Sequence, residues 1–232
     1  MKYQKIKKAV FKSRPNRFIA NVEVDGEAAI AHVKNTGRCR ELLVPDCTVY
    51  LSVSDNPTRK TKYDLVAVEK LCTDGHTLLI NMDSQAPNAM AEEWLPVSGL
   101  FSCEVIIRRE TTYGNSRFDF YIEDGCRKCF LEVKGVTLEK DGVAMFPDAP
   151  TERGVKHITE LIQCKKDGYE AYILFVIQMK GVSVFRPNVA THPAFAEALR
   201  AAQSAGVKLL AYDSVVTPDS ASIQAPVPID LT

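Results

Sequence analysis

The chain has 232 residues, of which 46% are hydrophobic and 25% charged, with 29 basic and 29 acidic side chains. This composition is typical of a folded protein with its own core, and it excludes a disordered or fibrous chain. The formal net charge of zero indicates no particular partner.

The first residues and the apolar runs bear on location. MKYQKIKKAVFKS has no continuous apolar stretch behind its basic residues, so it does not match a secretory signal. The longest apolar run, residues 171–177, has the length of a strand and is far shorter than the ~18 residues that cross a membrane. The seven cysteines are odd in number and scattered, which suits reduced thiols. We therefore predict a cytoplasmic protein with no membrane association.

Residues 1–85 are rich in short β-like runs separated by turn signals such as Asp-Gly and Asp-Asn-Pro. The runs cover residues 8–12, 17–24, 28–33, 48–54, 63–71 and 77–82. Strands this short and this closely spaced, without a long helix between them, predict a small closed barrel, for which an OB-like fold is one solution. This part holds 14 Lys and Arg against 10 Asp and Glu, so it is the basic part of the chain.

Residues 86–232 change pattern and predict a second domain, an α/β or α+β fold with a mixed sheet. A linker leads into a short helix, and Thr151 is a good N-cap for a helix that ends near Lys166. Another helix should begin near His192 and Pro193. Strands are expected at residues 103–111, 117–123, 129–134, 171–178, 182–186 and 207–213. The last dozen residues, rich in Pro and Ser, are interpreted as a tail.

The hairpin at residues 117–138 carries charged residues inside its strands. Alternation predicts that Phe118, Phe120 and Ile122 share one face, which leaves Asp119 on the other. If the apolar faces of both strands match, Phe120 pairs with Leu131 or with Cys129. Either register brings the carboxylate of Glu132 to the face of Asp119.

Two converging carboxylates repel each other unless a cation lies between them. A hard divalent cation such as Mg²⁺ or Mn²⁺ binds through one or two carboxylates, waters and substrate phosphate. Lys134 follows on the same face as Glu132 and could orient or deprotonate a water, or neutralise charge on a phosphate. The alternative is a solvated sheet face with ordinary surface charges. Spacing alone does not choose between them.

Four segments in order resemble the sugar fermentation stimulation protein A family. They are HVKNTGRCRELLVP at 32–45, SRFDFYI at 116–122, FLEVKGVTL at 130–138 and MFPDAPTERGVKHITEL at 145–161. The resemblance implies an OB-fold followed by a restriction-endonuclease-like domain of the PD-(D/E)xK nuclease superfamily, and a DNA-binding protein linked to sugar metabolism.

Carried over by position, the resemblance assigns metal binding to Asp119 and Glu132, and the catalytic lysine to Lys134. The superfamily often adds an acid from the preceding helix. AMAEEWL offers Glu92 or Glu93, and we expect Glu92 as the third metal ligand.

Further residues are candidates for contact with nucleic acid or for support of the site. On the helix after Thr151, helical spacing groups Arg153 and His157 as phosphate contacts, and Glu160 and Gln163 as supporting residues, although a solvated stripe fits equally. Arg117 should share the face of Asp119 and hold a phosphate, or form a surface salt bridge.

In the barrel, the Asn-Thr-Gly turn carries cations and free backbone amides that could contact a nucleic-acid backbone. The residues are Lys34, Asn35, Arg38 and Arg40. The alternative is a basic loop without a ligand.

The sequence thus predicts a DNA-binding protein with a Mg²⁺-dependent nuclease-type site. The alternative is a regulator of sugar metabolism genes that binds DNA without cleaving it. A barrel that binds a sugar is set aside, because one Trp offers no aromatic sugar site. The sequence does not indicate an oligomeric state.

Overall fold

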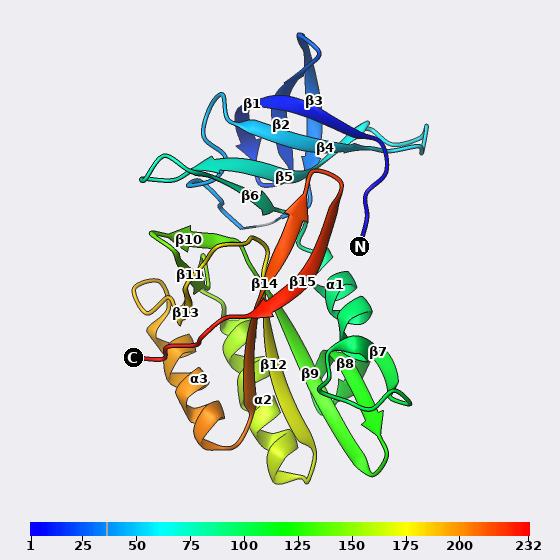
Figure 1. Cartoon of the computed structure of the whole chain (residues 1–232), viewed down its shortest axis with the longest axis vertical. Coiled ribbons are helices and arrows are strands. Elements are labelled where there is room, and N and C mark those ends of the chain that lie inside the picture. Colours follow the sequence, from blue (N-terminus) through cyan, green and yellow to red (C-terminus); the bar gives the residue numbers. More distant parts are fainter. Residues whose placement is uncertain (36) are drawn as a thin grey trace.

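The structure is a computed structural model that describes residues 1–35 and 37–232. A β-barrel lies at one end, and a sheet with helices lies at the other (Figure 1). Among the described residues, no helix combines the length and the apolar character that a membrane crossing requires.

The N-terminal barrel is built from alternating strands whose inward positions are apolar. In β2, for example, Ala20, Val22 and Val24 are buried while the residues between them are more exposed. The strands are β1 Ile6–Asn16, β2 Ile19–Val24, β3 Glu27–Val33, β4 Thr48–Val53, β5 Tyr63–Leu71 and β6 Thr77–Asn81. Antiparallel neighbours follow the order β3-β2-β1-β4-β5-β6, and a parallel pairing of β3 with β5 closes the barrel. The five strands β1 to β5 therefore close into a barrel, and β6 extends it by pairing with β5. The OB-like prediction is confirmed.

The C-terminal part is a six-stranded mixed sheet in the order β15-β14-β12-β9-β8-β7. The buried strand β12 pairs in parallel with β9 and β14, and the other pairings are antiparallel. The strands are β7 Ile106–Tyr113, β8 Ser116–Asp124, β9 Arg127–Val136, β12 Glu170–Ile177, β14 Lys208–Thr217 and β15 Ser220–Pro226. A smaller sheet joins β10 Leu138–Lys140, β11 Val143–Phe146 and β13 Val184–Pro187.

Helices cover both faces of the six-stranded sheet. They are α1 Ala86–Trp94, followed by the 3-10 turn η1 Leu95–Val97, then α2 Glu152–Lys166 and α3 Pro193–Ser204. Residues of α1 pack in one apolar cluster, and residues of α2 and α3 pack in another. Thr151 caps α2 as predicted, because its hydroxyl accepts the Gly154 N–H at 3.0 Å.

Helices cover both faces of the sheet, so the hairpin strands carry apolar side chains on both faces. The prediction that Phe118, Phe120 and Ile122 share one face is therefore wrong. Phe118 and Phe120 do not share a face. Phe118 lies 5.4 Å from the Phe130 ring on the side of α2, whereas Phe120 packs with Leu131 in the cluster that includes α1. The side-chain alternation therefore breaks at Asp119.

The expectation of a C-terminal tail is also wrong. Residues 220–226 form β15, which pairs with β14, and Ile229 bridges to Phe185 beyond it. Proline and serine suggested a loose end. The apolar positions Ala221 and Val227 are buried instead.

Gln178, at the end of β12, joins the sheet to the connection between the barrel and α1. Its side-chain amide is buried and donates to three acceptors around the end of β6, which are Asn81 O at 3.0 Å, Asn81 Oδ1 at 2.9 Å and Asp83 O at 3.1 Å. Buried amides that satisfy several acceptors fix the elements that carry them. The segment that this junction holds leads directly into α1, which packs against β9.

Candidate active site

Asp119 and Glu132 come together as the hairpin register requires. Phe120 pairs with Leu131, which is the first of the two registers predicted. The described ladder stops there, and the Asp119 carboxylate accepts the backbone N–H of Val133 at 2.8 Å in its place. The break in alternation at Asp119 and this side-chain contact are therefore parts of one local distortion.

Glu132 is the most enclosed group of the site, with 4% of its surface exposed. Its Oε1 accepts hydrogen bonds from Lys134 Nζ at 2.6 Å and from His157 Nδ1. Burial disfavours its charge, but the His157 hydrogen bond and the Lys134 charge outweigh burial and lower the pKa of Glu132. Its Oε2 is buried without a hydrogen-bond partner among the described atoms, which is costly for a carboxylate unless a ligand satisfies it.

Asp119 has the opposite electrostatic balance. Burial and the nearby Glu132 charge raise its pKa, while the Val133 N–H and the Asn88 amide act against them. Asn88 Nδ2 donates to Asp119 Oδ1 at 2.7 Å. Two neighbouring carboxylates whose pKa values move in opposite directions form a site at which a cation would stabilise both ionised forms.

His157 was predicted to contact phosphate, and the structure gives it another place. It is 5% exposed and lies beneath Glu132 on α2. Arg153 Nε lies 3.3 Å from His157 Nε2, and a guanidinium can only donate, so Nε2 accepts and Nδ1 carries the proton given to Glu132. His157 therefore orients Glu132. Arg153 is exposed and lies nearer the surface.

The predicted acid from α1 does not join the pair. Glu92 is half exposed and forms an ion pair with Arg109 at 2.8 Å, and Glu93 pairs with the N-terminal amine of Met1. The α1 residue at Asp119 is Asn88, one helical turn before Glu92. Asn88 could have been found from its position in the first turn of the helix. A helix whose start packs against the hairpin brings its first residues close to Asp119.

The other predicted residues of this domain lie away from the two carboxylates. Arg117 is exposed and pairs with Glu110 at 3.4 Å, which is the surface salt bridge weighed as its alternative. Gln163 donates to Asp167 at 2.8 Å near the end of α2, and it has no described contact with Glu132. Glu160 lies 3.9 Å from Lys156, and its Oε2 is buried without a described partner.

Gly135 explains why the chain can bring α1 so close to β9. A Cβ at this position would lie 2.6 Å from Gln178 Oε1 and 2.7 Å from Pro87 Cγ, which is closer than real contacts allow. A side chain here would push α1, and with it Asn88, away from the hairpin. The glycine after Lys134 is thus required by packing around the site.

In the barrel, the predicted contact residues divide into two groups. The Asn35-Thr36-Gly37 turn includes Thr36, which lies outside the described residues. Lys34 is occupied by Asp83 at 3.4 Å and Asp64 at 3.8 Å, and the side chain of Asn35 accepts the Gly37 N–H. Arg38 and Arg40 instead line a surface hollow of about 380 Å³.

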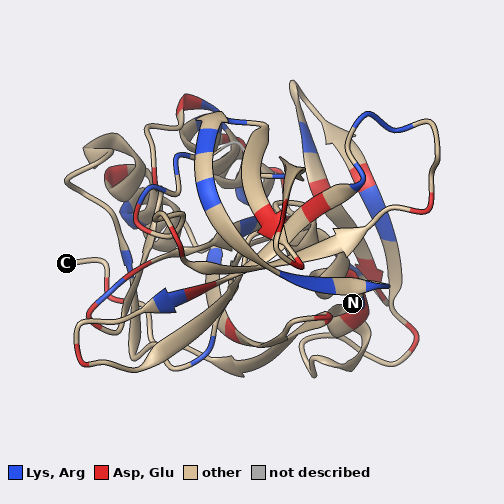
Figure 2. Ribbon diagram, turned by 90° about the horizontal axis from the view of Figure 1, so that it is seen from above, with Lys and Arg blue, Asp and Glu red and all other residues tan. Residues whose placement is uncertain are grey.

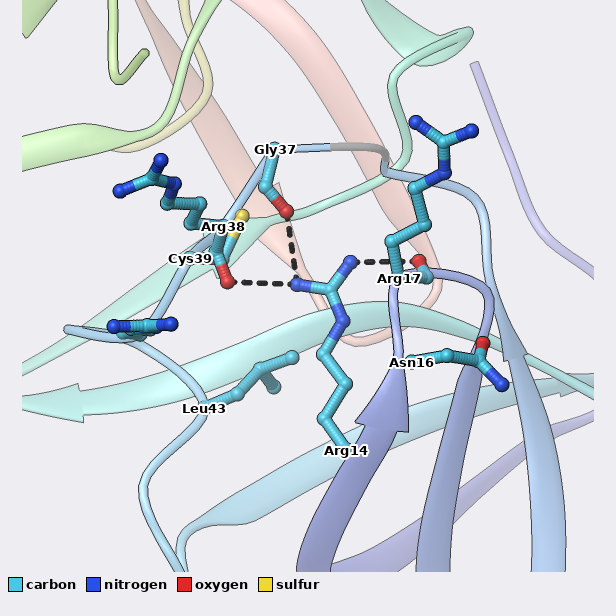
Figure 3. Close-up of a pocket in the computed structure, with 8 residues that line it drawn as sticks. Arg14, Asn16, Arg17, Gly37, Arg38, Cys39 and Leu43 are labelled. Carbon is cyan, nitrogen blue, oxygen red and sulfur yellow. Dashed lines mark hydrogen bonds between the residues drawn. The ribbon is translucent and has the colours of Figure 1, made fainter.

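Two arginines that were not predicted complete this hollow. Arg14 donates to four backbone carbonyls, and Arg17 projects beside it (Figure 3). Seen from the barrel end, lysines and arginines are otherwise interspersed with Asp and Glu (Figure 2). No local signal singles out Arg14 in SRPNR, because its role depends on a loop more than twenty residues later.

The donor set of Asp119 and Glu132 fits a hard divalent cation. Oxygen ligands from two carboxylates are the arrangement that Mg²⁺ uses when waters and phosphate complete its shell. The buried Oε2 of Glu132, which has no hydrogen-bond partner among the described atoms, could serve as one such ligand. The described residues contain no cluster of three or more His, Cys, Asp or Glu side chains suited to a metal, so the protein part of such a site is these two acids.

Comparison with known proteins places these features in one family. Residues 13–80 match the model described as the SfsA N-terminal OB domain, and residues 85–220 match that of the sugar fermentation stimulation protein RE domain. The chain belongs to the sugar fermentation stimulation protein family. Membership supports a DNA-binding or nuclease-like role in these general terms.

Close relatives cover nearly the whole chain. A sugar fermentation stimulation protein homolog of Desulfitobacterium hafniense is 58% identical over 220 residues, covering 95% of this chain and 94% of the relative. The homolog of Ruminiclostridium cellulolyticum is 54% identical over 231 residues and covers 100% of both. The solved structure of Pyrococcus furiosus SfsA in complex with Ca²⁺ is 28% identical, with a TM-score of 0.86 over 99% of this chain and 98% of that one.

Proposed function

We propose that the protein is a DNA-binding protein with a Mg²⁺-dependent, nuclease-type site for phosphodiester hydrolysis. The observation that carries the proposal is the buried Glu132, which is held by His157 and Lys134, has an unpaired Oε2, and is close enough to Asp119 to raise its pKa. The ionised form of Glu132 is held in place, and its second oxygen is left available to a cation. The Ca²⁺ in the Pyrococcus furiosus relative supports a divalent cation as that ligand, since Ca²⁺ and Mg²⁺ both take oxygen donors.

Each residue of the site has a defined part in this proposal. Asp119 and Glu132 hold the cation. When bound, the cation acts as a Lewis acid on a phosphoryl oxygen. Lys134, whose side chain keeps 13% of its surface exposed, can neutralise charge that builds on the phosphate. Arg153 extends from the His157 ring to the surface and can contact a neighbouring phosphate.

The direct test is isothermal titration of the wild-type protein and the Asp119→Ala variant with Mn²⁺ or Mg²⁺. We expect binding to the wild type and a loss of at least tenfold in affinity for the variant. The Glu92→Ala variant is the matched control and should bind like the wild type, because Glu92 pairs with Arg109 outside the site. Equal binding to wild type and Asp119→Ala would reject the metal site.

A second function is a DNA-binding regulator of sugar metabolism genes that does not cleave. The observation that favours it is Asn88, an amide at the position where a third acid would strengthen cation binding. Incubation with single-stranded, duplex and branched DNA and with RNA discriminates the two. Cleavage that Glu132→Ala abolishes supports the nuclease, and cleavage that persists in that variant indicates a contaminant. DNA binding without cleavage supports the regulator.

A further inference from the structure

The hollow in the barrel surface has an unusual charge arrangement. Its lining consists of four arginines with Asn16, Gly37, Cys39 and Leu43, and no Asp or Glu is among the described lining residues. Elsewhere in the barrel, six lysines and arginines pair with carboxylates, whereas the described ion pairs include none of these four arginines. The six are Lys5, Lys7, Lys12, Lys34, Arg59 and Lys70. The hollow therefore gathers four arginines, none of which forms a described ion pair, although the carboxylates of Asp148 and Glu41 lie near its rim.

Arg14 fixes the shape of the hollow. Its terminal nitrogens donate to the carbonyls of Asn35, Gly37, Arg38 and Arg17 at 2.6 to 2.9 Å. Carbonyls satisfy the hydrogen bonds of a guanidinium but do not cancel its charge, and Arg14 Nε is buried without a described partner. The floor is thus rigid and positively charged. Figure 3 shows Arg17 and Arg38 on either side of Arg14, with Leu43 below.

The size and lining fit a single nucleotide better than a strand. A hollow of about 380 Å³ lies at the lower end of the range for small-ligand pockets, ~300–1,000 Å³. An OB-fold groove that follows a strand spans ~4–16 nucleotides. The guanidinium forks of Arg38 and Arg40 suit the oxygens of a phosphate. Buried Leu43 and the flat Arg planes offer a surface for a base.

We propose that this hollow binds one nucleotide through its phosphate. The same chemistry is presented by the phosphorylated end of a nucleic-acid strand and by a free nucleotide. If the ligand is the end of a strand, this proposal rests on the proposed DNA-binding function, because it says which part of the DNA the barrel binds. Binding of a phosphorylated strand end would let the protein recognise the ends of DNA strands. Binding of a free nucleotide would make the protein respond to the concentration of that nucleotide.

The test is fluorescence anisotropy with a short single-stranded DNA that carries a phosphate at the 5′ end, at the 3′ end or at neither. Titration with deoxythymidine monophosphate and with inorganic phosphate forms a second arm. We expect one end phosphate to tighten binding about tenfold, or the nucleotide to bind and compete. Arg38→Ala and Arg40→Ala should remove the gain, and Arg38→Lys should restore only part of it.

Lys60→Ala is the matched control, because Lys60 is an exposed cation of the same barrel outside the hollow. If Lys60→Ala reduces the phosphate gain as much as Arg38→Ala does, general charge explains the effect and the pocket is rejected. If all three DNAs bind equally and the nucleotide does not bind, the pocket is likewise rejected while DNA binding stands. If the nucleotide binds and no DNA does, the pocket stands and the DNA function falls.

Discussion

The acid site holds a buried negative charge, whereas the barrel hollow holds positive charges at the surface. In the sheet domain, Glu132 is enclosed and its charge is held by two side chains from β9 and α2. In the barrel, the charges of Arg38 and Arg40 stay at the surface, and backbone carbonyls fix only Arg14. Removing any one of the groups that pair with Glu132 would leave a buried charge unpaired and lower the stability of the fold. The charges of Arg38 and Arg40 remain available to a ligand. We infer that the acid site is sensitive to any deletion, while the hollow tolerates change in its rim.

The two regions are also connected through the chain. An added Cβ on Gly37 would collide with the Asp148 carboxylate, so the loop that lines the hollow abuts the segment that leads into α2. That segment continues to the cap Thr151 and then to Arg153 and His157. The loop and the segment before α2 are therefore neighbours in space as well as being linked to the two regions.

The largest effect is expected for Glu132→Ala. It removes the common partner of Lys134 and His157 and leaves a buried cation unpaired, which costs about 3–5 kcal/mol in the free energy of unfolding. Glu92→Ala removes an exposed ion pair and should cost at most about 1 kcal/mol. Urea denaturation of both variants measures the difference. If both variants lose the same free energy of unfolding, the burial of Glu132 contributes no more to stability than the exposed ion pair of Glu92.

His157→Ala is expected to weaken Mn²⁺ affinity about 10–100-fold, because residues that orient a metal ligand typically contribute that much. Titration calorimetry measures it, with His157→Asn as a variant that can restore one hydrogen bond to Glu132. His76→Ala is the control, since His76 is an exposed residue in the turn between β5 and β6. Partial rescue by asparagine distinguishes an orienting role from mere packing. Unchanged affinity in His157→Ala would contradict the role assigned to it.

The pH dependence of stability should show the strain at Asp119. A raised folded pKa means that its stabilising contribution is present below the unfolded pKa, about 3.9, and is lost as pH rises through the folded pKa. In chelator, the wild type should therefore lose stability relative to Asp119→Asn over that interval. Saturating Mn²⁺ should restore the wild type alone. If the stability of the wild type depends on pH in the same way with and without Mn²⁺, the ionised Asp119 is not destabilised in the absence of the metal.

The smallest effect on stability is expected in the hollow. Arg38→Ala with Arg40→Ala should change the free energy of unfolding by no more than about 0.5 kcal/mol, as exposed substitutions do. The same double variant should weaken binding alike for all DNA sequences and reduce the salt slope by about 0.7, the value for one lost phosphate contact on a single strand. Filter binding measures both. An unchanged affinity and slope would exclude this rim from the nucleic-acid surface.

Much of the local structure follows from short-range rules. The barrel strands, the Thr151 cap and the helix at Pro193 were predicted because alternation, capping and proline act over a few residues. The register of the hairpin was narrowed to two by matching apolar faces, although Phe118 broke the assumed alternation. The C-terminal strand β15 was missed, because its pairing partner β14 and not its own composition makes it a strand.

The sequence by itself determined that Asp119, Glu132 and Lys134 lie in one hairpin and that the barrel carries the excess of basic residues. Only the tertiary structure decided that Asn88 and not Glu92 meets Asp119, that His157 turns inward to Glu132, and that Arg14 closes a hollow from far along the chain. Strand pairing between neighbours is fixed by local periodicity. Contacts between a helix and a sheet, or between a strand and a distant loop, depend on packing that no local pattern encodes.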